Sequence, residues 1–81
     1  MKLFSIVIPI FNEDQYIGDL LKSIFQIDYP ADKFEVIVVN DASTDKTAGI
    51  VREFPQAQLI DLQVNVGRYA ARKIGAEAAK H

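Results

Sequence analysis

The chain of 81 residues contains no cysteine, which excludes disulfide bonds, thiolate zinc sites and a cysteine nucleophile. Its one histidine is His81, the last residue, so neither a Ser-His triad nor a histidine-built metal site is expected. No apolar run approaches the length of about 20 residues that a transmembrane helix needs. The apolar run Leu3 to Phe11 is followed by polar residues without a cleavage site, unlike a signal peptide. We therefore expect a cytoplasmic location, although a longer parent protein could still associate with a membrane.

The composition is that of an ordinary globular domain, with 49% hydrophobic and 25% charged residues. A chain of this length can form one small domain, so residues 1–81 are expected to be a single, partial domain. The net charge of -2 gives no reason to expect nucleic-acid binding. Residues 66–81 carry four basic side chains and one acidic one, a local balance of +3. This basic end could hold an anion or could be the solvated face of a helix.

Apolar runs and helical periodicities alternate along the chain. We expect strands at 3–11, 34–40 and 57–62, and helices at 13–26, at 44–54 and from residue 68 onward. Asn12 with Gln15 resembles a capping box for the first helix, and Ser43 is a plausible cap for the second. Gly75 either weakens the third helix or permits close packing. The order β-α-β-α-β-α with right-handed crossovers predicts a parallel three-stranded sheet between helical layers, an α/β, Rossmann-like half of a nucleotide-binding fold.

Three loops should meet at the carboxyl edge of this sheet, where ligands bind in open α/β folds. They carry an aromatic ring (Phe11) and two carboxylates (Glu13 and Asp41), with Arg72 one turn into the third helix. A base could stack on Phe11, Asp41 could accept its N–H, and Glu13 could accept ribose hydroxyls. Arg72 could approach a phosphate. Taken singly, each residue also has a plain structural explanation, with Phe11 in the core and Asp41 shaping the turn.

Four linked motifs favour the binding roles over the plain structural explanations. They are Ser5-Ile-Val-Ile-Pro9-Ile-Phe11-Asn12-Glu13, then Tyr29-Pro30, then Val38-Val39-Asn40-Asp41-Ala42-Ser43-Thr44-Asp45, and finally Asn65-Val66-Gly67 with Ala71-Arg72-Lys73-Ile74-Gly75. In order and spacing they closely resemble the N-terminal part of the family 2 glycosyltransferases, which invert configuration and have the GT-A fold. The resemblance covers essentially the whole chain.

The resemblance implies that this region binds a nucleotide-diphospho-sugar, either a UDP- or a GDP-sugar. The nucleotide-binding residues that it implies are Pro9, Phe11, Glu13, Asp41 and Arg72. Three residues depart from the family pattern, namely Phe11 for the commoner tyrosine, Asn40 for the first aspartate and Lys73 for a frequent asparagine. These departures affect base preference and fine geometry more than family membership.

The family's metal-binding D-x-D motif and its general base lie beyond the equivalent of His81. The resemblance thus implies Mg²⁺ or Mn²⁺ for the parent enzyme, whereas no catalytic or metal-binding residue is expected in this chain. We predict that the parent protein transfers sugar to an acceptor hydroxyl and that the isolated chain is inactive.

The residues by themselves also allow other functions. A non-catalytic nucleotide-binding or protein-interaction module could use the same frame. A dinucleotide-binding oxidoreductase is disfavoured, because the first strand-helix turn lacks G-x-G-x-x-G. A reading frame that continues into D-x-D would favour the enzyme. The sugar and the acceptor are not specified by the sequence. The family's strand order leaves the strand at 3–11 as an open edge, which predicts a homodimer through the first strands or an exchange of the C-terminal helix.

Overall fold

The computed structural model describes residues 2–81, and it contains the expected alternation of strands and helices. The elements are β1 (Phe4–Ile10), α1 (Ile17–Phe25), η1 (Ala31–Lys33), β2 (Phe34–Asp41), α2 (Thr47–Arg52), β3 (Ala57–Leu62) and α3 (Arg68–Ala78). Within the described residues, the strands form one parallel sheet in the order β1-β2-β3. The expected three-layer α/β architecture is therefore confirmed.

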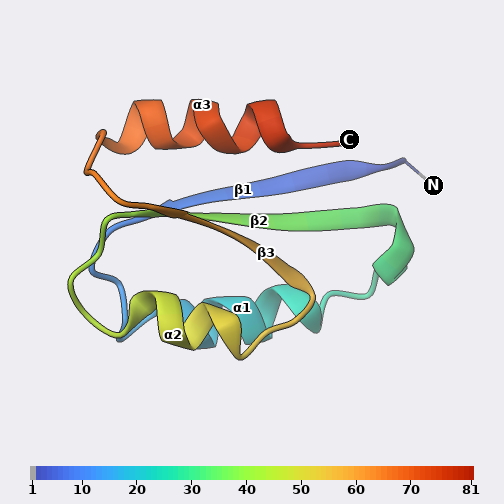
Figure 1. The fold of residues 1–81 in the computed structure, drawn as a ribbon. Coiled ribbons are helices and arrows are strands. Elements are labelled where there is room, and N and C mark those ends of the chain that lie inside the picture. The colour runs from blue at the N-terminus through green and yellow to red at the C-terminus, as the bar shows by residue number, and fades with distance from the viewer. Residues whose placement is uncertain (1) are drawn as a thin grey trace.

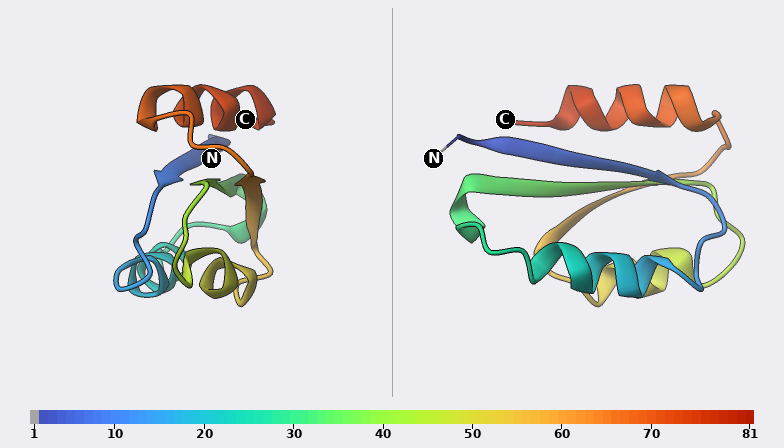
Figure 2. Two further views of the ribbon diagram at one scale, coloured as in Figure 1. Left: turned by 60° about the vertical axis from the view of Figure 1, so that its left-hand side comes forward. Right: turned by 180° about the vertical axis from the view of Figure 1, so that it is seen from behind.

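The two faces of the sheet are covered by different helices. α3 lies alone on one face, whereas α1 and α2 lie side by side on the other (Figures 1 and 2). The connections that leave the carboxyl ends of β1, β2 and β3 all emerge at the same end of the molecule (Figure 1). This arrangement brings the three expected loops to one edge of the sheet.

β2 is the central strand, and its residues alternate between the two faces. Val36 and Val38 point towards α1 and α2, while Ile37 and Val39 point towards α3. All four side chains are buried, as the β-branched run predicts for a strand that is covered on both faces. Pro9 lies in the edge strand β1, one residue before its end, where a missing N–H is tolerated.

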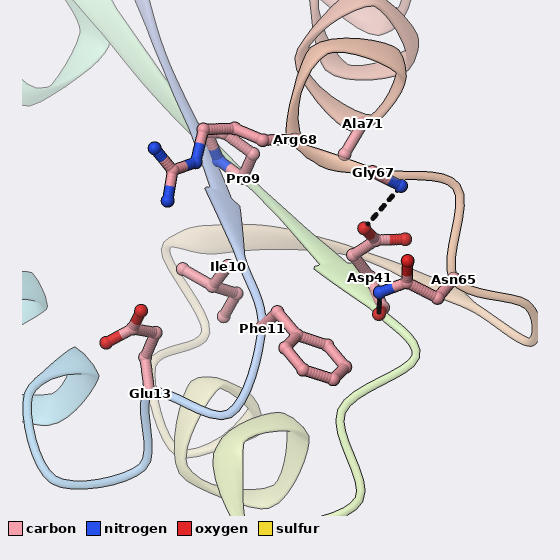
Figure 3. Close-up of a pocket in the computed structure, with 9 residues that line it drawn as sticks. All are labelled: Pro9, Ile10, Phe11, Glu13, Asp41, Asn65, Gly67, Arg68 and Ala71. Carbon is pink, nitrogen blue, oxygen red and sulfur yellow. Dashed lines mark hydrogen bonds between the residues drawn. The ribbon is translucent and has the colours of Figure 1, made fainter.

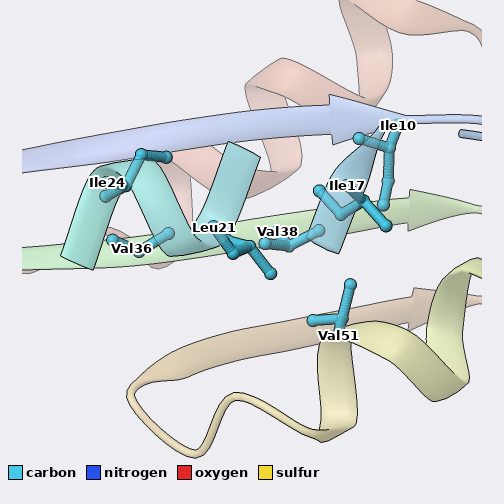
Figure 4. Packing of buried hydrophobic residues seen from close by; sticks show 7 residues of the cluster. All are labelled: Ile10, Ile17, Leu21, Ile24, Val36, Val38 and Val51. Carbon is cyan, nitrogen blue, oxygen red and sulfur yellow. The ribbon is translucent and has the colours of Figure 1, made fainter. Parts of the chain in front are cut away.

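The larger core lies between the sheet and the helices α1 and α2. The buried members of this cluster come from β1, α1, β2 and α2 (Figure 4); they are Ile10, Ile17, Leu21, Ile24, Val36, Val38 and Val51. Aromatic rings extend this core towards the opposite end of the sheet, where Phe25 stacks on Phe34 and Phe54. Most of the apolar burial therefore lies on this face.

The smaller core lies under α3, and the helix contributes only small side chains to it. Its buried members are Ile37, Val39 and Ala71. Gly75 approaches the sheet so closely that a Cβ atom there would lie 2.4 Å from Val7 Cγ1 and 2.9 Å from Val39 Cγ2. Of the two explanations for Gly75, close packing is the correct one.

The first two helices begin later than predicted, whereas α3 begins at Arg68 as expected. α1 starts at Ile17 instead of residue 13, and α2 starts at Thr47 instead of residue 44. Neither helix has a side-chain cap, so the capping box of Asn12 with Gln15 and the cap by Ser43 are both wrong. The polar residues before each helix bond instead to the other loop, as described below. α2 also ends at Arg52, two residues before the expected end.

Candidate functional site

A pocket of about 250 Å³ lies at the carboxyl edge of the sheet (Figure 3). Residues from all three loops line it, namely Pro9, Ile10, Phe11, Glu13, Asp41, Asn65, Gly67, Arg68 and Ala71. Four of the five residues expected at the site are among them, and Arg72 is the exception. The topology alone explains this convergence, because parallel strands carry their following loops to a common edge.

Asp41 ends β2 on the face that α3 covers, and only 4% of it is exposed. One carboxylate oxygen accepts the backbone N–H of Val66 at 2.7 Å, and the other accepts that of Gly67 at 2.9 Å. The Asn65 side chain donates to the Asp41 carbonyl at 3.1 Å. Asp41 thus fixes the loop that begins α3, whereas the plain structural explanation had it shape the turn after its own strand. Each carboxylate oxygen retains a further lone pair for another donor.

Phe11 is 47% exposed and borders the pocket, so it is not a core residue. Its ring lies between Glu13 and Asp41 in the view of Figure 3. Glu13 is held through its backbone, because its carbonyl accepts the N–H groups of Tyr16 and Ile17 at the start of α1. Within the described residues its carboxylate makes no hydrogen bond or ion pair. The pocket therefore offers an exposed aromatic face and a free carboxylate.

Two arginines begin α3, and the structure places them differently. Arg68 lines the pocket, and Figure 3 shows its guanidinium group on the same side of the view as Glu13. Arg72 is exposed and lies outside the pocket lining. Sequence reasoning passed over Arg68, although its position directly after Gly67 at the helix start could have indicated it. The role expected of Arg72 remains a prediction.

Polar residues after β1 and β2 bond to each other across the two loops. We call this set the loop clasp; it consists of Asn12, Glu13, Asp14, Ser43, Thr44, Asp45 and Thr47. Sequence reasoning missed it, and the available signals were the two polar runs at 12–15 and 40–45. Burial of Asp45 by itself raises the pKa of its carboxyl group. Hydrogen bonds from the Thr47 hydroxyl and from the amides of Thr47 and Asp14 outweigh that effect, so the pKa lies below its ordinary value.

Asn40, the neighbour of Asp41, is buried on the opposite face of the sheet. Its side-chain amide donates to Asp61 of β3 at 2.9 Å, and its side-chain oxygen accepts the N–H of Ser43 at 3.3 Å. The other oxygen of Asp61 pairs with Arg52 at 2.9 Å. An aspartate at position 40 could not donate to Asp61. The departure from the family pattern therefore matches the carboxylate that lies opposite it.

Within residues 2–81, no three His, Cys, Asp or Glu side chains gather closely enough to hold a metal ion. The expected metal of the parent enzyme thus does not fit the residues described. None of the helices in this part of the chain is long and apolar enough to cross a membrane.

Known proteins of similar sequence share this region. In TarS, the poly(ribitol-phosphate) beta-N-acetylglucosaminyltransferase of Staphylococcus aureus, 54 residues are 44% identical, covering 67% of this chain and 9% of that protein. The chain spans 9% of the length of TarS and 25% of the length of another curated relative, the glycosyltransferase AglE of Haloferax volcanii.

Solved structures give the same result. The crystal structure of residues 1–349 of S. aureus TarS in complex with UDP-GlcNAc superposes with a TM-score of 0.91 at 36% identity, over 99% of this chain and 24% of that one. The mannosyltransferase PcManGT from Pyrobaculum calidifontis, in complex with GDP-Man and Mn²⁺, gives a TM-score of 0.88 at 32% identity, over 95% of this chain and 24% of that one. The model of glycosyl transferase family 2 matches residues 5–81. The chain belongs to glycosyl transferase family 2.

Proposed function

We propose that this chain is the nucleotide-binding part of an enzyme that transfers a sugar from a nucleotide-diphospho-sugar to an acceptor hydroxyl. The observation that carries the proposal is the pocket, in which an exposed aromatic ring, two carboxylates and a helix-start arginine converge. Relatives of the same fold were solved with UDP-GlcNAc and with GDP-Man, which supports a nucleotide sugar as the ligand. We take residues 1–81 as a single, partial domain of that enzyme.

In this proposal, the base stacks on Phe11, whose exposed face is available without rearrangement of the core. Asp41 accepts a base N–H with a lone pair that the Val66 and Gly67 amides leave free. Since those amides also fix the carboxylate, Asp41 is pre-oriented before the nucleotide arrives. Glu13 accepts ribose hydroxyls with its free carboxylate.

The diphosphate would lie towards the start of α3. Arg68 lines the pocket and supplies a positive charge there, at the helix end whose dipole favours anions. Arg72, one turn further on, would have to reach the pocket from an exposed position. We therefore assign the nearer phosphate contact to Arg68 and keep Arg72 as a secondary candidate.

A metal ion and the general base belong, in this proposal, to parts of a longer enzyme. PcManGT was solved with Mn²⁺, whereas residues 2–81 of this chain offer no cluster that could hold such an ion. We accordingly propose that the isolated chain performs no transfer, with or without Mg²⁺ or Mn²⁺. Turnover of a nucleotide sugar above a boiled control would contradict this.

We also propose a cytoplasmic location for the whole protein and a homodimer of this chain. The cytoplasmic location is checked by fractionation of cells that express the whole protein. The homodimer would form through β1, which has a strand neighbour only on the β2 side within the described sheet. Sedimentation at tens of micromolar tests it, and a single monomeric species would exclude it.

The test of nucleotide binding is an NMR titration of the ¹⁵N-labelled chain with UDP and with GDP. We expect saturable shifts that cluster at residues 9–13, at 41 and at 65–71, with an affinity on the order of millimolar, because the diphosphate lacks a metal partner. Random or absent shifts would refute the proposal.

Phe11→Ala should weaken binding by about 1–3 kcal/mol, the usual value of one base stacked on an aromatic ring. Tyr16→Ala is the matched control, because Tyr16 is an exposed aromatic side chain outside the pocket lining. Equal loss in both variants would show that binding does not use the pocket. Glu13→Gln should weaken UDP and uridine alike if the carboxylate contacts the ribose.

A further inference from the structure

Three consecutive backbone amides of the first loop donate to side chains of the second loop. The Asn12 amide donates to Ser43 Oγ at 2.9 Å, and the Asp14 amide donates to Asp45 Oδ2 at 3.3 Å. Between them, the Glu13 amide donates to Thr47 Oγ1 at 3.1 Å. The loop before α1 therefore satisfies its amides through residues about thirty positions away, and not through a cap of its own helix.

The central bond of the loop clasp continues into the interior. Thr47 is fully buried, and its hydroxyl, having accepted the Glu13 amide, donates in turn to Asp45 Oδ1. The Thr47 amide also donates to that oxygen, at 2.9 Å. The Glu13 amide, the Thr47 hydroxyl and the Asp45 carboxylate thus form a chain in which each bond polarises the next.

The loop clasp holds the first loop in an uncommon backbone conformation. Asn12 has φ 52, in the left-handed region that non-glycine residues seldom occupy. Its side-chain oxygen accepts the Thr44 amide at 2.9 Å, which fixes this conformation from the other loop. Phe11 and Glu13 flank Asn12, so the direction of both side chains depends on it.

Ser43, Asp45 and Thr47 do not line the pocket. Each of them, however, accepts a backbone amide of the first loop, which carries the pocket residues Phe11 and Glu13. We propose that Thr47 and Asp45 are positioning residues, which set Phe11 and Glu13 in the geometry that binds the nucleotide. The consequence for binding rests on the proposed function, whereas the consequence for loop order does not. Outer residues of this kind commonly act by orienting those that touch the ligand.

Thr47→Val tests the proposal, because valine keeps the shape of threonine in its buried position and removes the hydroxyl. Thr47→Ser is its matched counterpart, because it keeps the hydroxyl and removes the methyl group. Two quantities are measured in each variant. The first is the hydrogen-exchange rate of the Glu13 amide in the free chain, and the second is the affinity for UDP by NMR titration.

We expect Thr47→Val to speed exchange at Glu13 and to weaken UDP binding by about tenfold, the effect of one lost hydrogen bond to a buried group. Thr47→Ser should preserve both the slow exchange and the affinity. Faster exchange with unchanged affinity would overturn the positioning role. Unchanged exchange would overturn the loop clasp itself.

The outcomes also separate this proposal from the proposed function. Suppose that the wild-type chain bound no nucleotide, but that exchange of the Glu13 amide were faster in Thr47→Val than in Thr47→Ser. The proposed function would then fail, and the loop clasp would stand. Should Thr47→Val fail to fold, Ser43→Ala replaces it at a half-buried position, with the Asn12 amide as the exchange probe. Faster exchange at Asn12 together with weaker UDP binding in Ser43→Ala supports the proposal, and an unchanged exchange rate or an unchanged affinity contradicts it.

Discussion

The two faces of the sheet are stabilised in opposite ways. Towards α1 and α2, large aliphatic and aromatic side chains fill the space between helix and strand. Towards α3, Ala71 and Gly75 let the helix backbone approach the strands directly. The first face is therefore stabilised by the burial of large side chains, and the second by the absence of side-chain atoms where the helix meets the strands. Substitutions that remove atoms should damage the first face, and those that add atoms should damage the second.

The same division separates Asn40 from Asp41 at the end of β2. Asn40 belongs to the α2 face and bonds to the β3 side chain Asp61 and to the loop that leads into α2. Asp41 belongs to the α3 face and accepts the amides at the start of α3. Adjacent residues of one motif thus fix two different helices, because side chains alternate along a strand. A carboxylate suits the position that faces amide donors, and an amide suits the one that faces a carboxylate.

The largest effect is expected from Leu21→Ala on the α1 face. Leu21 is fully buried among the cluster shown in Figure 4. Its truncation should lower the free energy of unfolding by roughly 3–5 kcal/mol, from lost burial and the cavity left behind. A domain of this size has about 4–12 kcal/mol in total, so the variant would lose a large fraction of its stability. Urea denaturation followed by circular dichroism measures it. Leu20→Ala on the exposed side of the same helix is the control and should change little.

Asn40→Asp should cost about 3 kcal/mol at neutral pH, because it buries a carboxylate at position 40 against the partly exposed carboxylate of Asp61. The double variant Asn40→Asp/Asp61→Asn restores a donor opposite an acceptor and should recover most of the loss. Thermal unfolding of the two single variants and the double variant forms the measurement. If the double variant were no more stable than Asn40→Asp, the pairing would not explain the departure from the family pattern.

Gly75→Ala should lower the free energy of unfolding by about 1–3 kcal/mol, through overpacking of the α3 face. The added Cβ would collide with Val7 and Val39, and both are β-branched side chains that cannot rotate freely away. Gly49→Ala in α2 is the matched control, because a Cβ there meets nothing within 4 Å. It should stabilise the chain slightly, since alanine favours the helix over glycine. Equal effects at the two glycines would contradict the close approach of α3.

Strand positions were predictable from the sequence because their signal is local. The run Val36 to Val39 is buried on both faces, and the third strand has the bounds 57–62 that were expected. The third helix begins at Arg68, as expected, but the starts of α1 and α2 were not predictable. Asn12 and Ser43 have the composition of caps but bond across loops that are distant in sequence. Capping rules consider only neighbours within a few residues, so they cannot reveal a partner about thirty positions away.

The site divides in the same way. Pro9, Phe11, Glu13 and Asp41 were brought to one pocket by topology, which the order of elements determines. Arg72 was expected from its place one turn into the third helix and from the family motif, whereas the residue that borders the pocket is Arg68. The direction of a helical side chain depends on where the helix begins and on its rotation against the sheet. The start at Arg68 was predicted, but the rotation of the helix against the sheet cannot be read from the motif.

The smallest effect concerns the end of α3, where Glu35 holds the chain against the sheet. Its Oε1 accepts the Ser5 hydroxyl at 2.7 Å and the backbone amides of Lys80 and His81. The hydrogen bond from Ser5, followed by that from Lys80, lowers the pKa of Glu35 below its ordinary value of 4.5. A carboxyl group with a lower pKa in the folded state stabilises that state above its unfolded pKa, and the contribution is lost as the pH falls through the folded value. The stability of the wild-type chain should therefore decline below about pH 4.5 in part through this group.

Glu35→Gln should remove that part of the decline while leaving a small, pH-independent loss at neutral pH. Urea denaturation at pH 7 and at several values below 4.5 measures both changes. Glu77→Gln, on the exposed surface of α3, is the control, because that carboxylate makes no hydrogen bond or ion pair within residues 2–81. If Glu35→Gln and Glu77→Gln gave identical pH profiles, the bonds to Ser5 and Lys80 would not stabilise the α3 face. If only Glu35→Gln gave the shallower profile, a carboxylate, and not burial alone, would secure the end of the helix that packs most closely on the sheet.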